Sequence, residues 1–208
     1  AQADHGLLIV GASPWSTALA RSLHEAQFDV LVIDGVWARL KAARQAGVPT
    51  YYGEILSEHA KEEVNTQHLS SVLCATRNDF YNALVCRALA RQFGQHRSLQ
   101  LPTQLEANQE SRRLTRQQRG HLAFDAKTGF DRLNQLLEQG WQFQMTNLTE
   151  AYCWQDFLAN GADERLIVGF IEPSGALRLH SDELPIPAKA GYRVLSFGPQ
   201  RAEKRAEV

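Results

Sequence analysis

The sequence has little cysteine, no long apolar run and almost no net charge. Its three cysteines, Cys74, Cys86 and Cys153, show no C-x-x-C spacing. Cys74 and Cys86 stand in apolar stretches, and free cysteine is among the most frequently buried residue types. We therefore expect ordinary core cysteines in a reducing compartment.

Positive and negative charges nearly balance, which gives no electrostatic reason to expect nucleic acid or an anionic membrane as a partner. The formal net charge is -1, so nothing in it favours nucleic acid or an anionic membrane surface. No apolar segment approaches the roughly 20 residues of a membrane-spanning helix, and no signal peptide opens the chain. The fragment itself is expected to be soluble, with no nucleic-acid partner.

Methionine is scarce too. Met145 is the only one, so Ala1 is not a natural translation start. We expect the chain to be processed or cut from a longer protein, and the missing part could hold the activity.

Recognisable catalytic and metal-binding motifs are missing as well. The seven histidines show no H-x-x-x-H spacing, and none stands in a catalytic motif. No lysine stands four residues after Tyr81, Tyr152 or Tyr192, so the Tyr-x-x-x-Lys arrangement of some dehydrogenases is absent. The sequence therefore predicts neither a metal site nor an enzyme.

What the chain does contain is an alternation of β-rich runs and helix-period segments over residues 6–101. With 44% hydrophobic and 22% charged residues, it can build a core. The predicted strands are Leu7–Val10, Val30–Asp34, Pro49–Tyr52, Ser71–Ala75 and Ser98–Leu101. The predicted helices are Pro14–Gln27, Val36–Ala46, Glu58–Gln67 and Asp79–Phe93. This order predicts a Rossmann-like, doubly wound parallel sheet of the α/β class, with strand order 3-2-1-4-5 and ligands at the carboxyl ends of the strands.

After residue 102, where the first domain (5–102) is expected to end, the pattern changes. Residues 103–120 predict a polar, exposed and partly helical connector, residues 121–198 a small α+β domain, and residues 199–208 a disordered tail. In the small domain we expect strands at 121–124, 141–148, 165–171, 176–179 and 191–197, and helices at 129–138 and 149–159. Arg112, Arg113, Arg116 and Arg119 form either a solvated face of the connector or a docking patch for an acidic partner.

The turn after the first strand is the strongest functional signal. A G-x-G-x-x-G fingerprint is present here only as Gly11-x-Ser13-x-x-Ser16. Gly11 allows the tight turn, Ser13 can cap the helix, and Pro14 suits its first position. We expect the N–H groups of residues 13 to 16, with the helix dipole behind them, to favour a phosphate.

Acidic and polar residues follow the other strands on the same rim. Asp34 stands 23 residues after Gly11, where a carboxylate reaches a ribose 2′-hydroxyl and repels the 2′-phosphate of NADP. Glu54 is placed to meet an adenine amino group and Thr76 a ribose. For Asn78 and Asp79, helix capping is an equally good interpretation.

These residues resemble the RCK domain (regulator of K+ conductance), also called TrkA-N, over the whole of residues 6–101. The family pattern is a glycine turn, an acid ending the second strand, an arginine about five residues on, Tyr/Phe-Gly-Asp after the third strand, and Asn-Asp-x-x-Asn opening the fourth helix. The matching residues here are Gly11, Asp34, Arg39, Tyr52-Gly53-Glu54, Asn78, Asp79 and Asn82. The departures are Ser13 and Ser16 for glycines and Glu54 for aspartate.

A narrower resemblance is to the cytosolic tails of bacterial Na+(K+)/H+ antiporters. It rests on residues 10–15, 49–57 and 99–102, and residues 191–195 look like the closing strand of an RCK C-terminal lobe. The resemblance implies a membrane-embedded antiporter domain in the same polypeptide. It also implies a location at the cytoplasmic face of the inner (plasma) membrane.

The resemblance implies a regulatory domain, usually a homodimer, that binds NAD(H), AMP or ATP and gates a monovalent cation:proton antiporter or a K+ transport system. Its nucleotide site would comprise Gly11, Ala12, Ser13, Pro14, Trp15, Asp34, Gly35, Arg39, Gly53, Glu54, Ile55, Thr76, Asn78, Asp79 and Asn82. Two other functions stay open: a ligand-free dimerisation and docking domain whose site is empty, and an NAD-dependent oxidoreductase.

Overall fold

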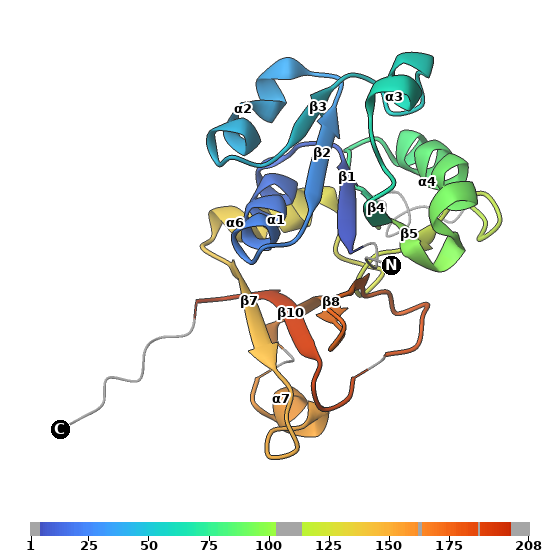
Figure 1. The fold of residues 1–208 in the computed structure, drawn as a ribbon. Helices are drawn as coiled ribbons and strands as arrows, with labels where there is room; N and C mark the ends of the chain where they lie inside the picture. Colours follow the sequence, from blue (N-terminus) through green and yellow to red (C-terminus); the bar gives the residue numbers. More distant parts are fainter. Residues whose placement is uncertain (1–4, 103–113, 162–163, 187, 201–208) are drawn as a thin grey trace.

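The computed structural model describes residues 5–102, 114–161, 164–186 and 188–200, and its larger part is a six-stranded parallel sheet (Figure 1). The strand order is β3-β2-β1-β4-β5-β6. These strands are β1 (Gly6–Val10), β2 (Val30–Asp34), β3 (Thr50–Tyr52), β4 (Leu69–Cys74), β5 (Ser98–Gln100) and β6 (His121–Leu122). Every residue of β1 and β4 is buried, as expected for central parallel strands covered on both faces.

Helices cover both faces of this sheet. They are α1 (Pro14–Glu25), α2 (Trp37–Gln45), α3 (Glu58–Glu63) and α4 (Asp79–Phe93), and a short 3-10 helix, η1 (Gln95–Arg97), leads into β5. Strand β1 shows how the layers form: Leu7 and Ile9 pack in the core that holds α1 and α2, and Leu8 packs in the core with α4. Alternate residues of a strand point to opposite faces, so one apolar run supplies both cores.

The smaller part is a four-stranded antiparallel sheet of order β7-β10-β8-β9. The strands are β7 (Gln142–Asn147), β8 (Leu166–Ile171), β9 (Leu177–Leu179) and β10 (Arg193–Gly198). Two helices belong to the same stretch of the chain, α6 (Phe130–Glu138) before β7 and α7 (Trp154–Ala159) after it. A turn over Glu172–Gly175 joins β8 to β9, with the Gly175 N–H donating to the Glu172 carbonyl at 2.8 Å. Phe157 of α7 is buried on this sheet beside Phe170.

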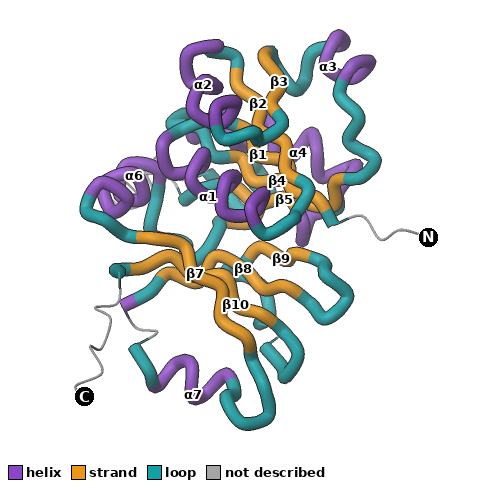
Figure 2. Tube along the Cα trace, turned by 60° about the vertical axis from the view of Figure 1, so that its left-hand side comes forward, coloured by secondary structure: helices purple, strands orange, loops and turns teal. Residues whose placement is uncertain are grey.

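One continuous apolar core joins the two sheets. Trp15 of α1 is fully buried, and its ring lies 5.6 Å from that of Phe124, 5.8 Å from Phe143 and 6.2 Å from Phe197, measured between centroids. Helix α6 lies beside α1 in both views (Figures 1 and 2). The start of α1 is therefore fixed by residues far along the chain.

The predicted doubly wound sheet is confirmed, including the order 3-2-1-4-5. The structure adds β6, which pairs with β5: the strand predicted at 121–124 joins the large sheet and not the small one. The helix predicted over 149–159 begins only at Trp154, and the one predicted over 58–67 ends at Glu63. Residues 103–113 and 201–208 lie outside the described residues, so the expectations for Arg112, Arg113 and most of the tail are not addressed.

Two further expectations concern single residues. Cys74 and Cys86 are buried in the core on the α4 side, as predicted, and burial raises the pKa of the Cys74 thiol. Arg119 does not lie on a solvated face: its side chain is 11% exposed and pairs with Glu183 at 2.7 Å. Arg119 turns inward because it pairs with the carboxylate of Glu183 on the loop after β9, which lies 64 residues further along the chain. Among the described helices, none is long and apolar enough to cross a membrane.

Candidate functional site

The turn after β1 passes very close to the loop after β4. Gly11 has φ +107°, and a Cβ at this position would lie 2.8 Å from the backbone nitrogen of Thr76. Only glycine fits both the dihedral angle and the space. The tight turn expected of Gly11 is present.

The two serines that replace glycines close this turn by hydrogen bonds of their own. The Ser16 hydroxyl donates to the Gly11 carbonyl at 2.7 Å and accepts from the Ser13 N–H at 2.8 Å. The Ser13 hydroxyl in turn accepts from the Ser16 N–H at 3.1 Å, which completes a capping box. Ser13 and Ser16 are both buried.

The expectation of available N–H groups at the start of α1 is therefore wrong. The N–H groups of Ser13 and Ser16 bond to each other's side chains, and Pro14 has none. The N–H of Trp15 donates at 2.9 Å to Oδ1 of Asn134, which lies on α6. In a glycine-rich turn these N–H groups stay open for a phosphate. Here the serine hydroxyls and the side-chain amide of Asn134 accept their hydrogen bonds instead.

Asp34 ties the end of β2 to the same turn. It is 7% exposed, and its Oδ2 accepts from the Ala12 N–H at 2.8 Å while its Oδ1 accepts from the Val36 N–H at 2.7 Å. The guanidinium of Arg39 approaches Oδ1 at 3.8 Å. The carboxylate that the sequence assigns to a ribose thus also holds the backbone of two loops, and each oxygen retains a second lone pair.

The loop after β4 is held by Asn82 from the first turns of α4. Its Oδ1 accepts from the Thr76 N–H at 3.0 Å and from the Thr76 hydroxyl at 2.6 Å, and its Nδ2 donates to the Thr76 carbonyl at 2.9 Å. Asn78 caps α4 by accepting from the Tyr81 N–H at 2.9 Å. Asn82 is almost fully buried, so it positions this loop from behind.

Glu54 reaches across the rim from the loop after β3 to α4. Its Oε2 accepts a short hydrogen bond from the Tyr81 hydroxyl. Burial, followed by this contact with Glu54, raises the pKa of Tyr81, so the phenol stays protonated and donates. A Cβ on Gly35 would lie 2.6 Å from Oε1 of Glu54, so glycine there leaves room for the carboxylate.

Two adjoining cavities lie on this rim. The larger, of about 330 Å³, opens between the ends of β2, β3 and β4, and the smaller, of about 230 Å³, opens beside the start of α1. Both are lined by the same five residues, Gly11, Asp34, Arg39, Thr76 and Arg77. Arg77 also pairs with Asp131 of α6 at 3.5 Å. Two guanidinium groups thus stand at the junction of the cavities.

The structure brings most of the predicted site residues to these cavities. The larger cavity is lined by Gly11, Asp34, Gly35, Arg39, Gly53, Glu54, Thr76 and Asn78, and the smaller adds Ala12, Ser13 and Pro14. Four predicted residues line neither cavity: Trp15, Ile55, Asp79 and Asn82. Trp15 and Ile55 belong to the core, and Asp79 opens α4.

Three polar residues in or next to these cavities were not among the predicted site residues, nor were the apolar lining residues Val10, Ile33, Val36, Ala75 and Phe130. Arg77 stands between Thr76 and Asn78, and its charge at the end of a strand was a signal that could have pointed to it. Tyr81 and Asn134 gave no such signal, because their partners lie 27 and 119 residues away in the sequence. Among the described residues, no group of three or more His, Cys, Asp or Glu side chains could hold a metal ion.

The rim therefore offers hydrogen-bond acceptors on one side and positive charge beside them. Asp34 and Glu54 can accept from hydroxyl or amino groups, and Arg39 and Arg77 can donate to an anion. Such a surface can bind a polar, anionic small molecule.

The sequence model of the TrkA-N domain family matches residues 7–117, more than half of the chain. Among curated proteins, no sequence is similar enough to count as a match.

Several solved structures are similar to the chain. One is the NAD(P)-binding domain of an exopolyphosphatase-related protein from Archaeoglobus fulgidus, with 17% identity, a TM-score of 0.44, and coverage of 56% of this chain and 84% of that chain. Another is the GsuK RCK domain, with 18% identity, a TM-score of 0.47, and coverage of 96% and 45%. A third is the GsuK channel bound to NAD, with 16% identity, a TM-score of 0.42, and coverage of 96% and 37%. The chain spans less than half of these two GsuK chains.

Proposed function

The chain belongs to the TrkA-N domain family, and from this premise we propose that it is a regulatory domain that binds an adenine nucleotide at the rim of its parallel sheet. The observation that carries the proposal is the convergence of four strand ends on two adjoining cavities that share Asp34, Arg39 and Arg77. The nucleotide acts as a signal, and no chemistry on it is needed.

The larger cavity suits the nucleoside. Asp34 retains lone pairs toward the ribose hydroxyls, and Glu54 presents a carboxylate where an adenine amino group can donate. Val10 and Ile33 supply an apolar wall to the same cavity. Apolar lining with a few convergent polar groups is the usual character of a small-molecule site.

The phosphate is assigned to Arg39 and Arg77, because the N–H groups that begin α1 are already bonded within the protein. Guanidinium groups donate to phosphate in a planar, often bidentate geometry. A monophosphate at the junction of the cavities needs only these side chains, whereas the pyrophosphate of NAD has to displace Asn134 from Trp15. AMP is therefore favoured over NAD(H) and ATP.

The nucleotide regulates through linkage. Arg77 and Asn134 connect the rim to α6, so a ligand that engages Arg77 competes with its pairing to Asp131. A ligand that binds one arrangement of α6 better shifts the population toward it. The partner is a membrane-embedded cation:proton antiporter or K+ transport domain of the same polypeptide, at the cytoplasmic face of the membrane.

A homodimer is the proposed assembly, through α4. Phe80 and Leu84 stand one turn apart on this helix and are each 60% exposed, beside a wide groove between α3 and α4. Large apolar side chains gathered on one exposed helix face mark an interaction surface.

The test is thermal unfolding and calorimetric titration with AMP, ADP, ATP, NAD and NADH. A one-site ligand at about 100 times its Kd stabilises the protein by about 2.7 kcal/mol. Arg39→Gln and Arg77→Gln should each weaken AMP binding about tenfold, as expected for one charge-assisted contact. Arg44→Gln, on the exposed face of α2, is the matched control. Stabilisation by none of the five nucleotides would leave a ligand-free docking domain, the alternative that the internally bonded α1 turn supports.

A further inference from the structure

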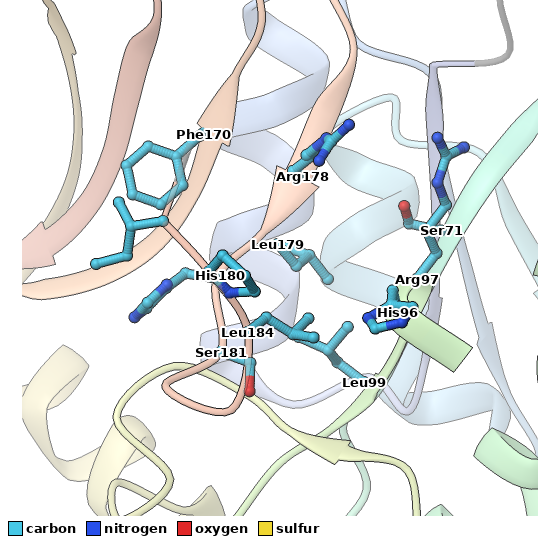
Figure 3. A pocket seen from close by; sticks show the side chains of 12 residues that line it. Ser71, His96, Arg97, Leu99, Phe170, Arg178, Leu179, His180, Ser181 and Leu184 are labelled. Carbon is cyan, nitrogen blue, oxygen red and sulfur yellow. The ribbon is translucent and has the colours of Figure 1, made fainter. Parts of the chain in front are cut away.

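A separate cavity lies between the two sheets, at the amino ends of β4 and β5 (Figure 3). Its volume is about 410 Å³, within the range of small-molecule sites. The large sheet contributes η1, Leu99 of β5 and Ser71 of β4, and the small sheet contributes β8, β9 and the chain that follows β9. The nucleotide rim lies at the opposite, carboxyl ends of the parallel strands.

The cavity has an apolar interior. Leu99, Phe170 and Leu179 line it, and all three are buried. Pro185 and Ile186 form its outer wall, and Ile186 is 47% exposed. An apolar wall that stays partly open to solvent can receive a hydrocarbon chain.

Its charged side chains are all basic. Arg97 and Arg178 line it, Figure 3 shows their guanidinium groups extending to the same side, and neither Asp nor Glu is among its lining residues. Glu172 pairs with Nε of Arg178 at 2.5 Å, which fixes the side chain and leaves its two outer nitrogens to donate elsewhere. Among the described residues, no carboxylate lies within 4.0 Å of the guanidinium of Arg97.

Two histidines complete the polar lining. His180 is buried, and its Nε2 contacts Asp182 at 3.0 Å, while burial lowers its pKa. The ring of His96 stacks on that of His121 with centroids 5.4 Å apart. These contacts hold both rings in place, so the two arginines remain the groups that set the charge of the cavity.

We propose that this cavity binds a small amphipathic organic anion, a carboxylate with a short apolar chain, as a second effector distinct from the nucleotide. The carboxylate lies between Arg97 and Arg178, and the chain lies against Phe170 and Leu179. Because the lining residues come from both sheets, the bound anion contacts both and stabilises one arrangement of the small sheet relative to the large one. The proposal does not depend on nucleotide binding.

The experiment is calorimetric titration of the chain with hexanoate, at millimolar concentration, beside hexan-1-ol and hexylammonium as probes with the same chain and a different head group. We expect saturable one-to-one binding of hexanoate only. Arg97→Gln and Arg178→Gln should each weaken it about tenfold, the effect of one lost charge-assisted hydrogen bond. Arg21→Gln, an exposed arginine on α1, should leave it unchanged.

A hexanoate titration with no saturable signal would overturn the proposal. So would equal binding of hexan-1-ol, or hexanoate binding that survives both arginine substitutions, because the cavity would then not select an anion. Measuring AMP binding on the same variants shows whether a failure concerns this cavity alone or also the proposed nucleotide site. We expect AMP affinity to be unaffected by Arg97→Gln and Arg178→Gln.

Discussion

At the scale of single residues, Ser13 and Ser16 decide what the turn after β1 can bind. Each replaces a glycine of the dinucleotide fingerprint, and each uses its hydroxyl to satisfy a backbone group of the turn. Asn134 does the same for Trp15 from a distant helix. The helix dipole still points at the rim, but its donors are already engaged.

Asn134 offers a direct test of this competition. Asn134→Ala should release the Trp15 N–H and tighten NAD binding several-fold, while the loss of its hydrogen bonds costs about 1 kcal/mol of stability. Asn134→Asp keeps an acceptor at that N–H and adds negative charge, so NAD binding should weaken. Isothermal titration with NAD measures the affinity of both variants, and urea unfolding measures their stability. An identical NAD affinity in both variants would contradict a competition at this position.

Glu183 predicts how stability depends on pH. Burial raises its pKa, but hydrogen bonds from Arg119 and from the Leu122 N–H outweigh burial, and the pKa lies below its ordinary value of 4.5. Its contribution is therefore complete above pH 4.5 and is lost as the pH falls through the lowered pKa.

Glu183→Gln should accordingly be less stable than the parent chain at pH 7, and the difference should shrink as the pH falls below 4.5. Urea unfolding at a series of pH values measures it, with the exposed Glu62→Gln as the control. A difference that stays constant down to pH 3 would show that the ionised carboxylate is not the stabilising form.

At the scale of the elements, the sequence predicted the large sheet well, because buried parallel strands leave short apolar runs and their covering helices leave periodic apolar patterns. The apolar run of β1 and the caps at Ser13 and Asn78 are local signals, and the structure confirms them. The pairing of β6 with β5, and the contact of Glu54 with Tyr81, depend on how distant segments meet. Such contacts leave no periodicity in one sequence. For the same reason, most loop side chains at the rim could be predicted, whereas Tyr81 of α4 and Asn134 of α6 could not.

The proposed homodimer interface on helix α4 can be tested by substituting Leu84. Leu84→Glu should shift a dimer toward the monomer, raising the dissociation constant at least tenfold, because a buried leucine contributes about 1.5–3 kcal/mol. Since Leu84 is 60% exposed in the single chain, the fold of the monomer should be unaffected. Sedimentation equilibrium measures the effect. Leu158→Glu, on α7, is the control at an exposed leucine of the other sheet. Equal dissociation constants for Leu84→Glu and the parent chain would place the interface elsewhere.

At the scale of the whole molecule, the two sheets share one core. Trp15 stands at the centre of it, between the large sheet, Phe124 and the small-sheet residues Phe143 and Phe197. A site on either sheet is therefore mechanically connected to the other. This shared core is the physical basis for expecting a ligand at the rim, or between the sheets, to act on the whole chain.

Unfolding should accordingly be a single cooperative transition, with circular dichroism and tryptophan fluorescence giving the same midpoint in urea. Trp15→Ala should lower the stability of the whole chain by about 3–5 kcal/mol, as for other large buried aromatics. Trp37→Ala, at a residue 53% exposed, should change it little. Two separate transitions, with Trp15→Ala shifting only one of them, would mean that the sheets unfold independently.

The central claim is that an adenine nucleotide binds at the carboxyl rim of the parallel sheet, and mapping of backbone amide shifts during an AMP titration tests it most directly. We predict saturable shifts that are largest at Gly11, Gly35, Gly53 and Thr76, and much smaller at Gly169 in the small sheet. Shifts confined to other parts of the chain, or no saturable shift with AMP, ADP, ATP, NAD or NADH, would contradict the claim.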